Sequence, residues 1–252
     1  MRVLEDIYYT QERNEMQMLD VYLPDGRPDA VFMFMHGGGL TRGSRKKCME
    51  HVPQYMTKEG IAVVSVEYRM YPDAVYPDFI DDAVYALKWI IDNKESVFGG
   101  FDELYVGGSS AGGYMSMMLC FAPEFLAKVG LDNSVISGYF HDAGQPTAHF
   151  EVLNRMGEDS RRVVVDERAP LYYIGQLPSY PRMRFIVSDN DMACRLEQTM
   201  LVMATLRHFG YEGFDYQLKH GKHTHYTRLL DENGESVYGR MITDFIKNRT
   251  EQ

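Results

Sequence analysis

A serine between glycines, in the segment GSSAG at residues 108–112, constrains the fold of this chain more than any other feature. An apolar run at residues 104–106 precedes it, and an apolar run of helical character at residues 114–119 follows it. This order predicts a strand, a sharp turn and a helix, with Ser110 at the apex of the turn. Glycines are needed there because side chains would clash across so tight a turn. A serine held in this way presents its hydroxyl group clear of the sheet, as a nucleophile requires.

A second glycine motif, HGGG at residues 36–39, ends the apolar run at residues 30–35. Consecutive glycines at a strand end can turn several backbone N–H groups toward one point, which stabilises an oxyanion without any side chain. A plain glycine-rich turn is the alternative interpretation. We expect His36 to be an orienting, hydrogen-bonded residue and not a base.

Short apolar runs alternate with helical patterns along the chain. The runs expected to form buried strands are 30–35, 61–66, 104–106, 133–137, 183–187 and 214–218, after opening strands at 2–10 and 15–23. Helices are expected over 78–94, 195–209 and 235–247. This alternation predicts an α/β fold with a mostly parallel central sheet flanked by helices. Ligands bind at the carboxyl ends of the strands in such sheets, and both glycine motifs fall there.

Taken together, these segments resemble the α/β-hydrolase esterases of the hormone-sensitive-lipase and acetyl-esterase type. That group shows the same order of HGGG, a Tyr-Arg-x-x-Pro segment, a Pro-led helix with Asp-Ala and Trp, and GxSAGG. The residues that carry the resemblance between the two glycine motifs are Tyr68, Arg69, Pro72, Pro77, Asp81, Asp82, Ala83 and Trp89. The likeness covers about residues 15 to 250. It implies an α/β-hydrolase fold without a large N-terminal cap; Ser109 stands where many members carry Asp or Thr, which leaves the chemistry intact.

The length of 252 residues fits a single α/β-hydrolase domain over residues 1–252. One irregular stretch at about residues 139–180 interrupts the pattern, and a loop this long in a compact domain is usually functional. The resemblance also suggests a small lid insertion here; a surface excursion without substrate contact is the alternative. The polar and aromatic residues expected in this lid are His141, Asp142, His149, Phe150, Tyr172 and Tyr173.

A serine nucleophile needs a base, and the base needs an orienting acid. In this fold class the order along the chain is Ser, acid, His. The strand expected at residues 183–187 runs into Ser188-Asp189-Asn190-Asp191. The family pattern at this strand end is Gly-x-x-Asp, and with Ser188 in the glycine place it aligns Asp191 with the acid. Asp189 is the second candidate.

Three histidines compete for the role of base after the strand expected at residues 214–218. His220 lies too near the strand. Relatives often show Gly-x-x-His followed by an aromatic residue, which favours His223, and the ambiguous spacing leaves His225 as the alternative. A metal site formed by these histidines is disfavoured because no further His or Cys set completes it. We therefore expect neither a metal nor a cofactor.

The complete constellation predicts a serine carboxylesterase. Ser110 attacks an ester carbonyl, and the backbone N–H groups of Ala111, Gly38 and Gly39 hold the oxyanion. The polar and aromatic character of the expected lid favours short acyl esters, acetyl esters first. Two other functions stay open: an amide hydrolase such as an aryl-formamidase or small peptidase on the same triad, and a non-catalytic, hydrolase-like ligand receptor.

Composition limits the partners and the location. A net charge of −10 argues against nucleic acid and anionic membranes as partners and leaves a small-molecule ester as the expected one. The acidic start of the chain is not that of a signal peptide, and no apolar run approaches membrane-spanning length. Cys48, Cys120 and Cys194 are widely spaced without a CxxC pair, which indicates reduced thiols in a cytoplasmic protein. The oligomeric state is unknown from these features.

Overall fold

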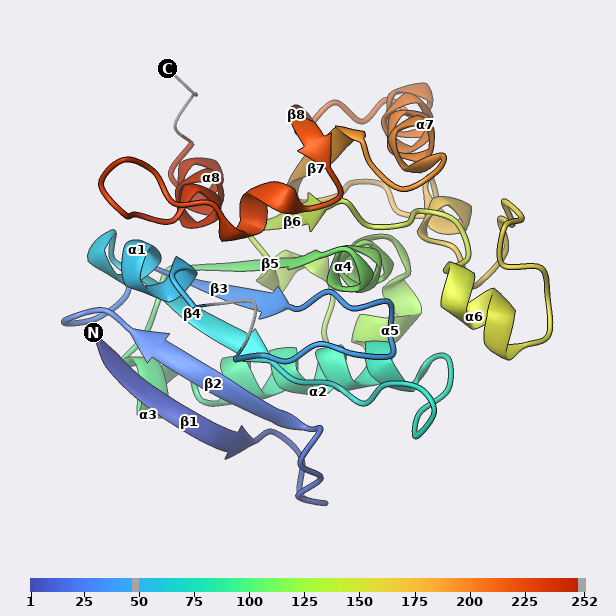
Figure 1. Cartoon of the computed structure of the whole chain (residues 1–252). Coiled ribbons are helices and arrows are strands. Elements are labelled where there is room, and N and C mark those ends of the chain that lie inside the picture. The colour runs from blue at the N-terminus through green and yellow to red at the C-terminus, as the bar shows by residue number, and fades with distance from the viewer. Residues whose placement is uncertain (47–49, 249–252) are drawn as a thin grey trace.

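An eight-stranded sheet forms the centre of the computed structural model, which describes residues 1–46 and 50–248 (Figure 1). The strand order is β1-β2-β4-β3-β5-β6-β7-β8. The bounds are β1 Arg2–Tyr8, β2 Met18–Leu23, β3 Ala30–Met35, β4 Ile61–Val66, β5 Glu103–Ser109, β6 Gly138–Asp142, β7 Arg182–Asn190 and β8 Phe214–Lys222. β2 pairs antiparallel with β1 and with β4, and the other neighbours pair in parallel. The mostly parallel sheet predicted from the sequence is confirmed.

Helices cover both faces of this sheet because successive side chains of each buried strand point to opposite faces and both sets are apolar. Along β3, Val31 and Met33 pack on the side of α2 (Asp78–Asp92), α4 (Ala111–Phe121) and α7 (Arg195–His208), whereas Phe32 and Phe34 pack on the side of α1 (Val52–Lys58) and α8 (Val237–Ile246). α1 and α8 lie side by side (Figure 1). The remaining helices are short: α3 Lys94–Phe98, α5 Pro123–Ala127, α6 Phe150–Arg155 and the 3₁₀ turns η2 Asn133–Val135, η3 Pro170–Tyr173 and η4 His225–Arg228.

The strand predicted at residues 133–137 is wrong. Those residues begin with the 3₁₀ turn η2, and the strand, β6, follows at Gly138–Asp142. His141 and Asp142, which the sequence analysis placed in the irregular stretch, are both buried in β6, and each makes side-chain hydrogen bonds. Nδ1 of His141 lies 2.8 Å from the Ser116 hydroxyl oxygen, and Asp142 accepts hydrogen bonds from tyrosine hydroxyl groups. The segment between β6 and β7 therefore covers residues 143–181, and His141 and Asp142 belong to the sheet and not to the insertion.

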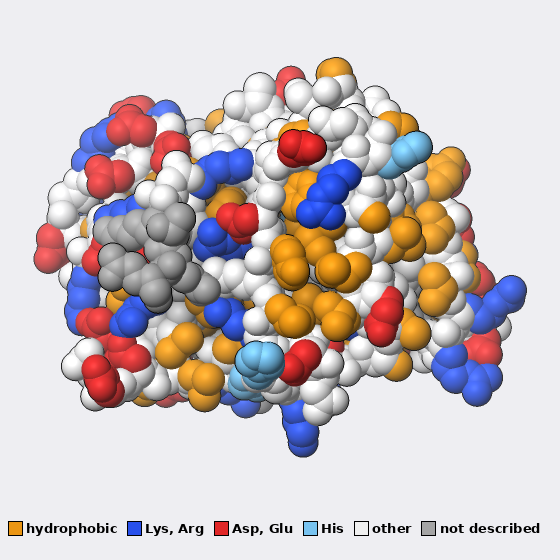
Figure 2. Space-filling model, turned by 90° about the horizontal axis from the view of Figure 1, so that it is seen from above, with side chains coloured by type: hydrophobic (Ala, Val, Ile, Leu, Met, Phe, Trp, Pro, Cys, Tyr) orange, Lys and Arg blue, Asp and Glu red, His pale blue; other side chains and the backbone are white. Residues whose placement is uncertain are grey.

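Hydrophobic side chains gather near the β8 edge of the sheet, as Figure 2 shows from above. The exposed ones include Tyr216 and Leu218 on β8 and Met200 and Leu201 on α7.

Over residues 1–46 and 50–248, no helix is both long and apolar enough to cross a bilayer.

The structure places two of the three cysteines. Cys120 is buried in α4 and Cys194 is exposed, and both are free thiols. Burial raises the pKa of the Cys120 thiol well above its usual value, so this residue is an inert part of the core. Cys48 lies outside the described residues.

Candidate active site

The turn between β5 and α4 holds Ser110 in a strained conformation, at the apex of the sharp turn that the sequence predicts. Ser110 has φ of 57° and ψ of −110°, immediately after the end of β5 and before the first residue of α4. Its backbone N–H donates a hydrogen bond to the Asp142 carbonyl oxygen at 2.8 Å. A side chain at Gly112 is impossible here, because a Cβ atom would lie 2.0 Å from the Met35 carbonyl oxygen. Close packing of the helix start on β3 thus fixes the position of the serine.

Five side chains gather at one edge of the sheet because they directly follow, or end, parallel strands. His36 follows β3, Ser110 follows β5, Asp142 ends β6, Asp191 follows β7 and His223 follows β8. The carboxyl ends of parallel strands share one edge. Residues more than 180 positions apart in the chain are therefore neighbours in the fold.

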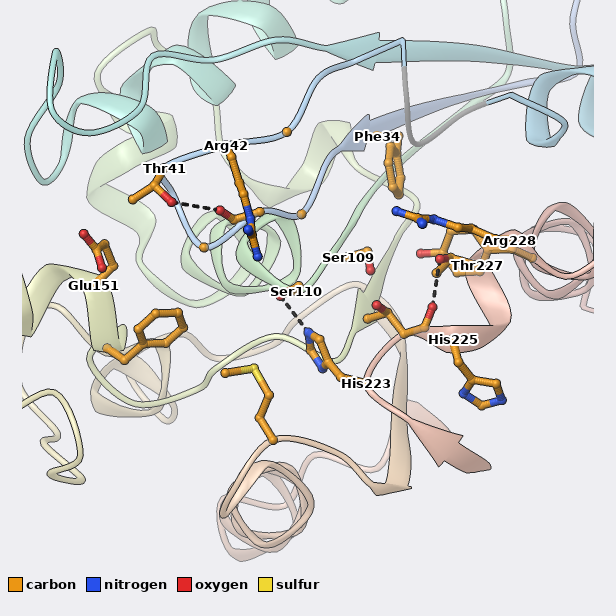
Figure 3. Close-up of a pocket in the computed structure, with 18 residues that line it drawn as sticks. Phe34, Thr41, Arg42, Ser109, Ser110, Glu151, His223, His225, Thr227 and Arg228 are labelled. Atoms are coloured by element: carbon orange, nitrogen blue, oxygen red, sulfur yellow. Dashed lines mark hydrogen bonds between the residues drawn. The ribbon is translucent and has the colours of Figure 1, made fainter.

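His223 connects Ser110 to Asp191 (Figure 3). Its Nε2 atom lies 2.8 Å from the Ser110 hydroxyl oxygen, and its Nδ1 atom lies 2.5 Å from Oδ1 of Asp191. The Asp191 carboxylate also accepts backbone N–H groups from Met192 at 2.7 Å and Ser188 at 3.3 Å. Burial disfavours its ionised form, but the hydrogen bond and charge of His223 and these two N–H groups outweigh burial and lower the pKa of Asp191. Asp191 is thus ionised at neutral pH and can orient the imidazole.

The alternative candidates lie elsewhere. Asp189 accepts hydrogen bonds from His220 at 2.6 Å and from the Gly221 N–H at 2.9 Å, near the surface. His225 bonds through Nδ1 to the Lys222 carbonyl oxygen at 2.8 Å, and its ring points away from Ser110 (Figure 3). The three histidines thus have separate partners. Within the part of the chain that the structure describes, no group of three His, Cys, Asp or Glu side chains could hold a metal ion.

The HGGG loop brings backbone N–H groups to the same pocket. Gly38 has φ of +139°, and a Cβ atom there would lie 1.6 Å from the Arg42 carbonyl oxygen, so only glycine fits this turn. Gly38 and Gly39 line the pocket with Ser110, and among the described residues their N–H groups donate no hydrogen bond. Ala111 is the first residue of α4, where backbone N–H groups lack helical partners. This arrangement can donate hydrogen bonds to an oxyanion beside Ser110.

The pocket has a volume of about 880 Å³. Only Phe150 and Glu151, at the start of α6, come from the segment 143–181. The other residues of this segment that were expected in a lid do not line the pocket: His149 and Tyr173 are buried, and Tyr172 is exposed. The pocket-lining residues are Phe34, Gly37, Gly38, Gly39, Thr41, Arg42, Gly43, Ser109, Ser110, Phe150, Glu151, Met192, His223, Thr224, His225, Thr227, Arg228 and Tyr238.

A buried ion-paired network supports the HGGG side of the pocket. Nε2 of His36 lies 2.9 Å from the Glu67 carboxylate, which also pairs with the Arg45 guanidinium at 3.3 Å. Arg45 Nε lies 3.1 Å from the Asp20 carboxylate. The Tyr68 hydroxyl donates to the His36 carbonyl oxygen at 2.7 Å. His36 is hydrogen-bonded, as expected from the sequence, and its orienting role stays a prediction.

A second buried carboxylate, Asp142, supports the opposite side. The hydroxyl groups of Tyr226 and Tyr238 donate to its two carboxylate oxygens, the latter at 2.8 Å. Burial raises the pKa of Asp142 to about 6, because hydrogen bonds from Tyr226, Ser109 and Tyr238 offset burial only in part. Tyr226 comes three residues after His223, and the Asp142 carbonyl oxygen holds the Ser110 N–H. Asp142 therefore connects the serine turn to the loop that carries His223, a role that the sequence analysis missed.

Part of the chain is similar to known proteins. A family model described as BD-FAE matches residues 19–152, which is 134 of the 252 residues. Among curated proteins, the chain is 28% identical over 153 residues to "Lipase 2" of Moraxella sp. (strain TA144), covering 61% of this chain and 32% of that protein. It is 34% identical over 89 residues to "Carboxylesterase NlhH" of Mycobacterium tuberculosis, covering 35% of this chain and 28% of that protein. The chain spans about a third of the length of these curated relatives.

Solved structures show the same fold over almost the whole chain. A truncated carbohydrate esterase from gut microbiota has a TM-score of 0.79 and 16% identity, covering 99% of this chain and 96% of that chain. Esterase B from Lactobacillus rhamnosis has a TM-score of 0.75 and 19% identity, covering 98% of this chain and 84% of that chain. The α/β-hydrolase fold predicted from the sequence is confirmed.

Proposed function

The chain belongs to the BD-FAE family, in agreement with its resemblance to esterases of the hormone-sensitive-lipase and acetyl-esterase type, and from that premise we propose that it is a serine carboxylesterase. The observation that carries the proposal is the hydrogen-bonded series from Asp191 through His223 to Ser110 at the wall of the pocket. The names of the curated relatives, a lipase and a carboxylesterase, support esters over amides as substrates.

The proposed mechanism begins when the Ser110 hydroxyl oxygen attacks the ester carbonyl carbon and His223 Nε2 accepts its proton. Asp191 holds the Nδ1–H of the imidazole and stabilises the imidazolium that forms. The N–H groups of Gly38, Gly39 and Ala111 donate hydrogen bonds to the oxyanion. His223 then protonates the leaving alcohol. A water molecule, deprotonated by His223, attacks the acyl-enzyme, and the acid leaves as Ser110 regains its proton.

The lining of the pocket supports a short acyl group. Its larger apolar side chains, Phe34, Phe150, Met192 and Tyr238, are interspersed with glycines and threonines. A long alkyl chain would need continuous apolar contact, which contributes about 0.8 kcal/mol per buried methylene. We therefore propose that acetyl and propionyl esters are preferred. We also propose that the chain is one α/β-hydrolase unit in which segment 143–181 acts as a lid through α6.

The partners and location expected from the sequence stay predictions. The net charge of −10 supports a protein that binds neither nucleic acid nor anionic membranes. The expectation of a cytoplasmic location is inferred from the wide spacing of the cysteines. Fractionation of the source cells tests it.

The nucleophile is tested by replacing Ser110. Because the triad acts as a unit, Ser110→Ala should lower kcat by about 10⁴-fold or more while the unfolding temperature is retained. A serine-directed phosphonate should label Ser110 alone, as read by peptide mass spectrometry.

The base is tested by replacing the two candidate histidines. His223→Ala should abolish activity and His225→Ala should have a modest effect; the reverse ranking would transfer the role of base to His225.

The substrate class is tested with a chain-length series of 4-nitrophenyl esters and the matching 4-nitroanilides. We expect kcat/KM to fall beyond butyryl and the anilides to be poor substrates. A maximum at octanoyl or longer would contradict the short acyl site. Faster turnover of an anilide than of its ester would favour an amide hydrolase, and the absence of both turnover and labelling would favour a non-catalytic receptor.

A further inference from the structure

Two arginine side chains line the pocket without an acidic partner. Arg42 lies in the loop that follows HGGG, and Arg228 ends η4; Figure 3 shows them extending from two sides of the space around Ser110. Across residues 1–46 and 50–248, neither side chain makes a hydrogen bond, an ion pair or a ring contact. By contrast, Arg45 nearby pairs with acidic side chains.

The backbone that carries each arginine is nevertheless held in place. The Arg42 N–H donates to the Gly38 carbonyl oxygen at 3.2 Å, and its own carbonyl oxygen packs against Gly38. On the other side, the Thr227 hydroxyl donates to the Thr224 carbonyl oxygen at 2.8 Å, and Tyr226 is anchored on Asp142. Only the side chains must be ordered when a ligand binds, which reduces the entropic cost of binding.

The charges of the pocket are unbalanced. Among the residues that line it, Glu151 is the sole carboxylate, and the Arg155 guanidinium already neutralises it at 2.7 Å. The protein as a whole has a net charge of −10, so its global field does not attract anions. Arg42 and Arg228 are exposed, so a neutral substrate in the pocket would leave their guanidinium groups hydrated and gain nothing from their charge. A substrate with an anionic group would replace that water with charge-assisted hydrogen bonds.

Resting on the esterase function proposed above, we propose that the substrate is an ester that carries an anionic oxyacid group, a carboxylate or a phosphate, which Arg42 and Arg228 bind while Ser110 attacks the ester. The guanidinium fork matches both groups, because each offers two oxygens at the spacing of two parallel N–H donors. The anionic group belongs either to the acyl part or to the alcohol part of the ester, and the experiment below distinguishes these two possibilities.

The test compares anionic and neutral members of matched ester pairs. In the acyl arm, 4-nitrophenyl hydrogen succinate is compared with its methyl ester. In the alcohol arm, 4-acetoxybenzoate is compared with its methyl ester and 4-acetoxyphenyl phosphate with its dimethyl ester, because a monomethyl phosphate would still carry a negative charge. Each kcat/KM is normalised to the rate of hydroxide hydrolysis, which removes differences in intrinsic reactivity. We expect the anionic member to be favoured in one arm by roughly 10-fold, the effect of one charge-assisted hydrogen bond in a partly open site.

The variants Arg42→Gln and Arg228→Gln should each reduce this ratio, and the double variant should abolish it. Arg162→Gln, an exposed arginine outside the pocket, is the matched control and should retain it. Added salt should reduce the wild-type ratio, a readout that needs no variant. A ratio of one in every wild-type pair, or a ratio that survives in the double variant, would overturn the proposal. Turnover of the neutral esters with labelling at Ser110 would still support the esterase function in that case, whereas loss of both would reject that function itself.

Discussion

Two buried carboxylates support the two sides of the active site, and they are compensated in different ways. Glu67, behind the HGGG segment, is paired with the imidazole of His36 and the guanidinium of Arg45. Asp142, behind the serine turn and the loop of His223, has no ion-pair partner among the described residues and accepts hydrogen bonds from the hydroxyl groups of Ser109, Tyr226 and Tyr238. Burial opposes ionisation in both, but the pKa of Glu67 is lowered by its partners whereas that of Asp142 is raised to about 6.

In this pair, the carboxylate with a guanidinium partner has a lowered pKa, and the carboxylate with only hydroxyl donors has a raised pKa. An ion-paired carboxylate stays ionised through the neutral range and acts as a fixed part of the scaffold. A carboxylate bonded only to hydroxyl groups changes its protonation near pH 6 and changes its hydrogen bonds with it. The HGGG side of the site is therefore expected to be less sensitive to pH than the side of Asp142.

The largest expected effect is that of Glu67→Ala. This substitution leaves His36 and Arg45 buried without their shared partner, and breaking a buried pair in this way costs about 3–5 kcal/mol of the free energy of unfolding. The measurement is urea denaturation followed by circular dichroism. Asp102→Ala, which removes the exposed ion pair with Arg27, is the control and should change stability little. A loss as small as that of the control would show that charge pairing does not hold the HGGG side.

Asp142→Asn tests the opposite side. The amide group faces two hydroxyl donors with one acceptor oxygen, so either Tyr226 or Tyr238 can no longer donate to this side chain. We expect kcat to fall by about 10-fold with little change in KM, because the His223 loop shifts relative to Ser110. Ser116→Ala is a matched control, since it removes a buried hydrogen bond to the adjacent β6 residue His141. It should lower stability and leave kcat unchanged; an equal loss of kcat in both variants would reduce Asp142 to a structural role.

Two tyrosines, one on each side of the site, allow the stabilising effect of their hydroxyl hydrogen bonds to be compared. The Tyr226 hydroxyl donates to a carboxylate and the Tyr68 hydroxyl to a carbonyl oxygen. Since hydrogen bonds to charged groups contribute about 1.5–3 kcal/mol and neutral ones about 1 kcal/mol, Tyr226→Phe should cost more stability than Tyr68→Phe. Thermal unfolding of both variants near pH 7.5 measures the difference. Equal losses would indicate that Asp142 is already protonated at that pH.

The sequence predicted the parts of the site that follow local patterns. The glycines around Ser110 and after His36 reveal tight turns, and Asp191 and His223 follow strands in the order expected for the fold. The supporting role of Asp142 could not be predicted from the sequence, because its partners Tyr226 and Tyr238 lie 84 and 96 residues away. No local pattern predicts that a polar residue at a strand end will accept hydrogen bonds from such distant groups. Arg42 and Arg228 lie next to the recognised motifs, but only the fold shows that both line one pocket and lack partners there.

The smallest expected signal is the pH dependence of stability, in which the two carboxylates act with opposite signs. The pKa of Glu67 is below its ordinary value of 4.5, so its contribution to stability is present above that pH and is lost as the pH falls below it.

The pKa of Asp142, about 6 in the folded chain, is above its ordinary value of 3.8. Its contribution is therefore fully present below about pH 4 and is lost as the pH rises through about 6, because the unfolded chain releases this proton more readily. Between these two pH values, Asp142→Asn should remove a downward slope in the unfolding free energy that the wild type shows. Urea denaturation at half-unit steps, with Ser116→Ala as the reference, isolates this difference from the titration of surface carboxylates. Parallel curves for wild type and Asp142→Asn in this window would show that hydroxyl groups alone keep a buried carboxylate ionised, which would remove the contrast between the two sides of the site.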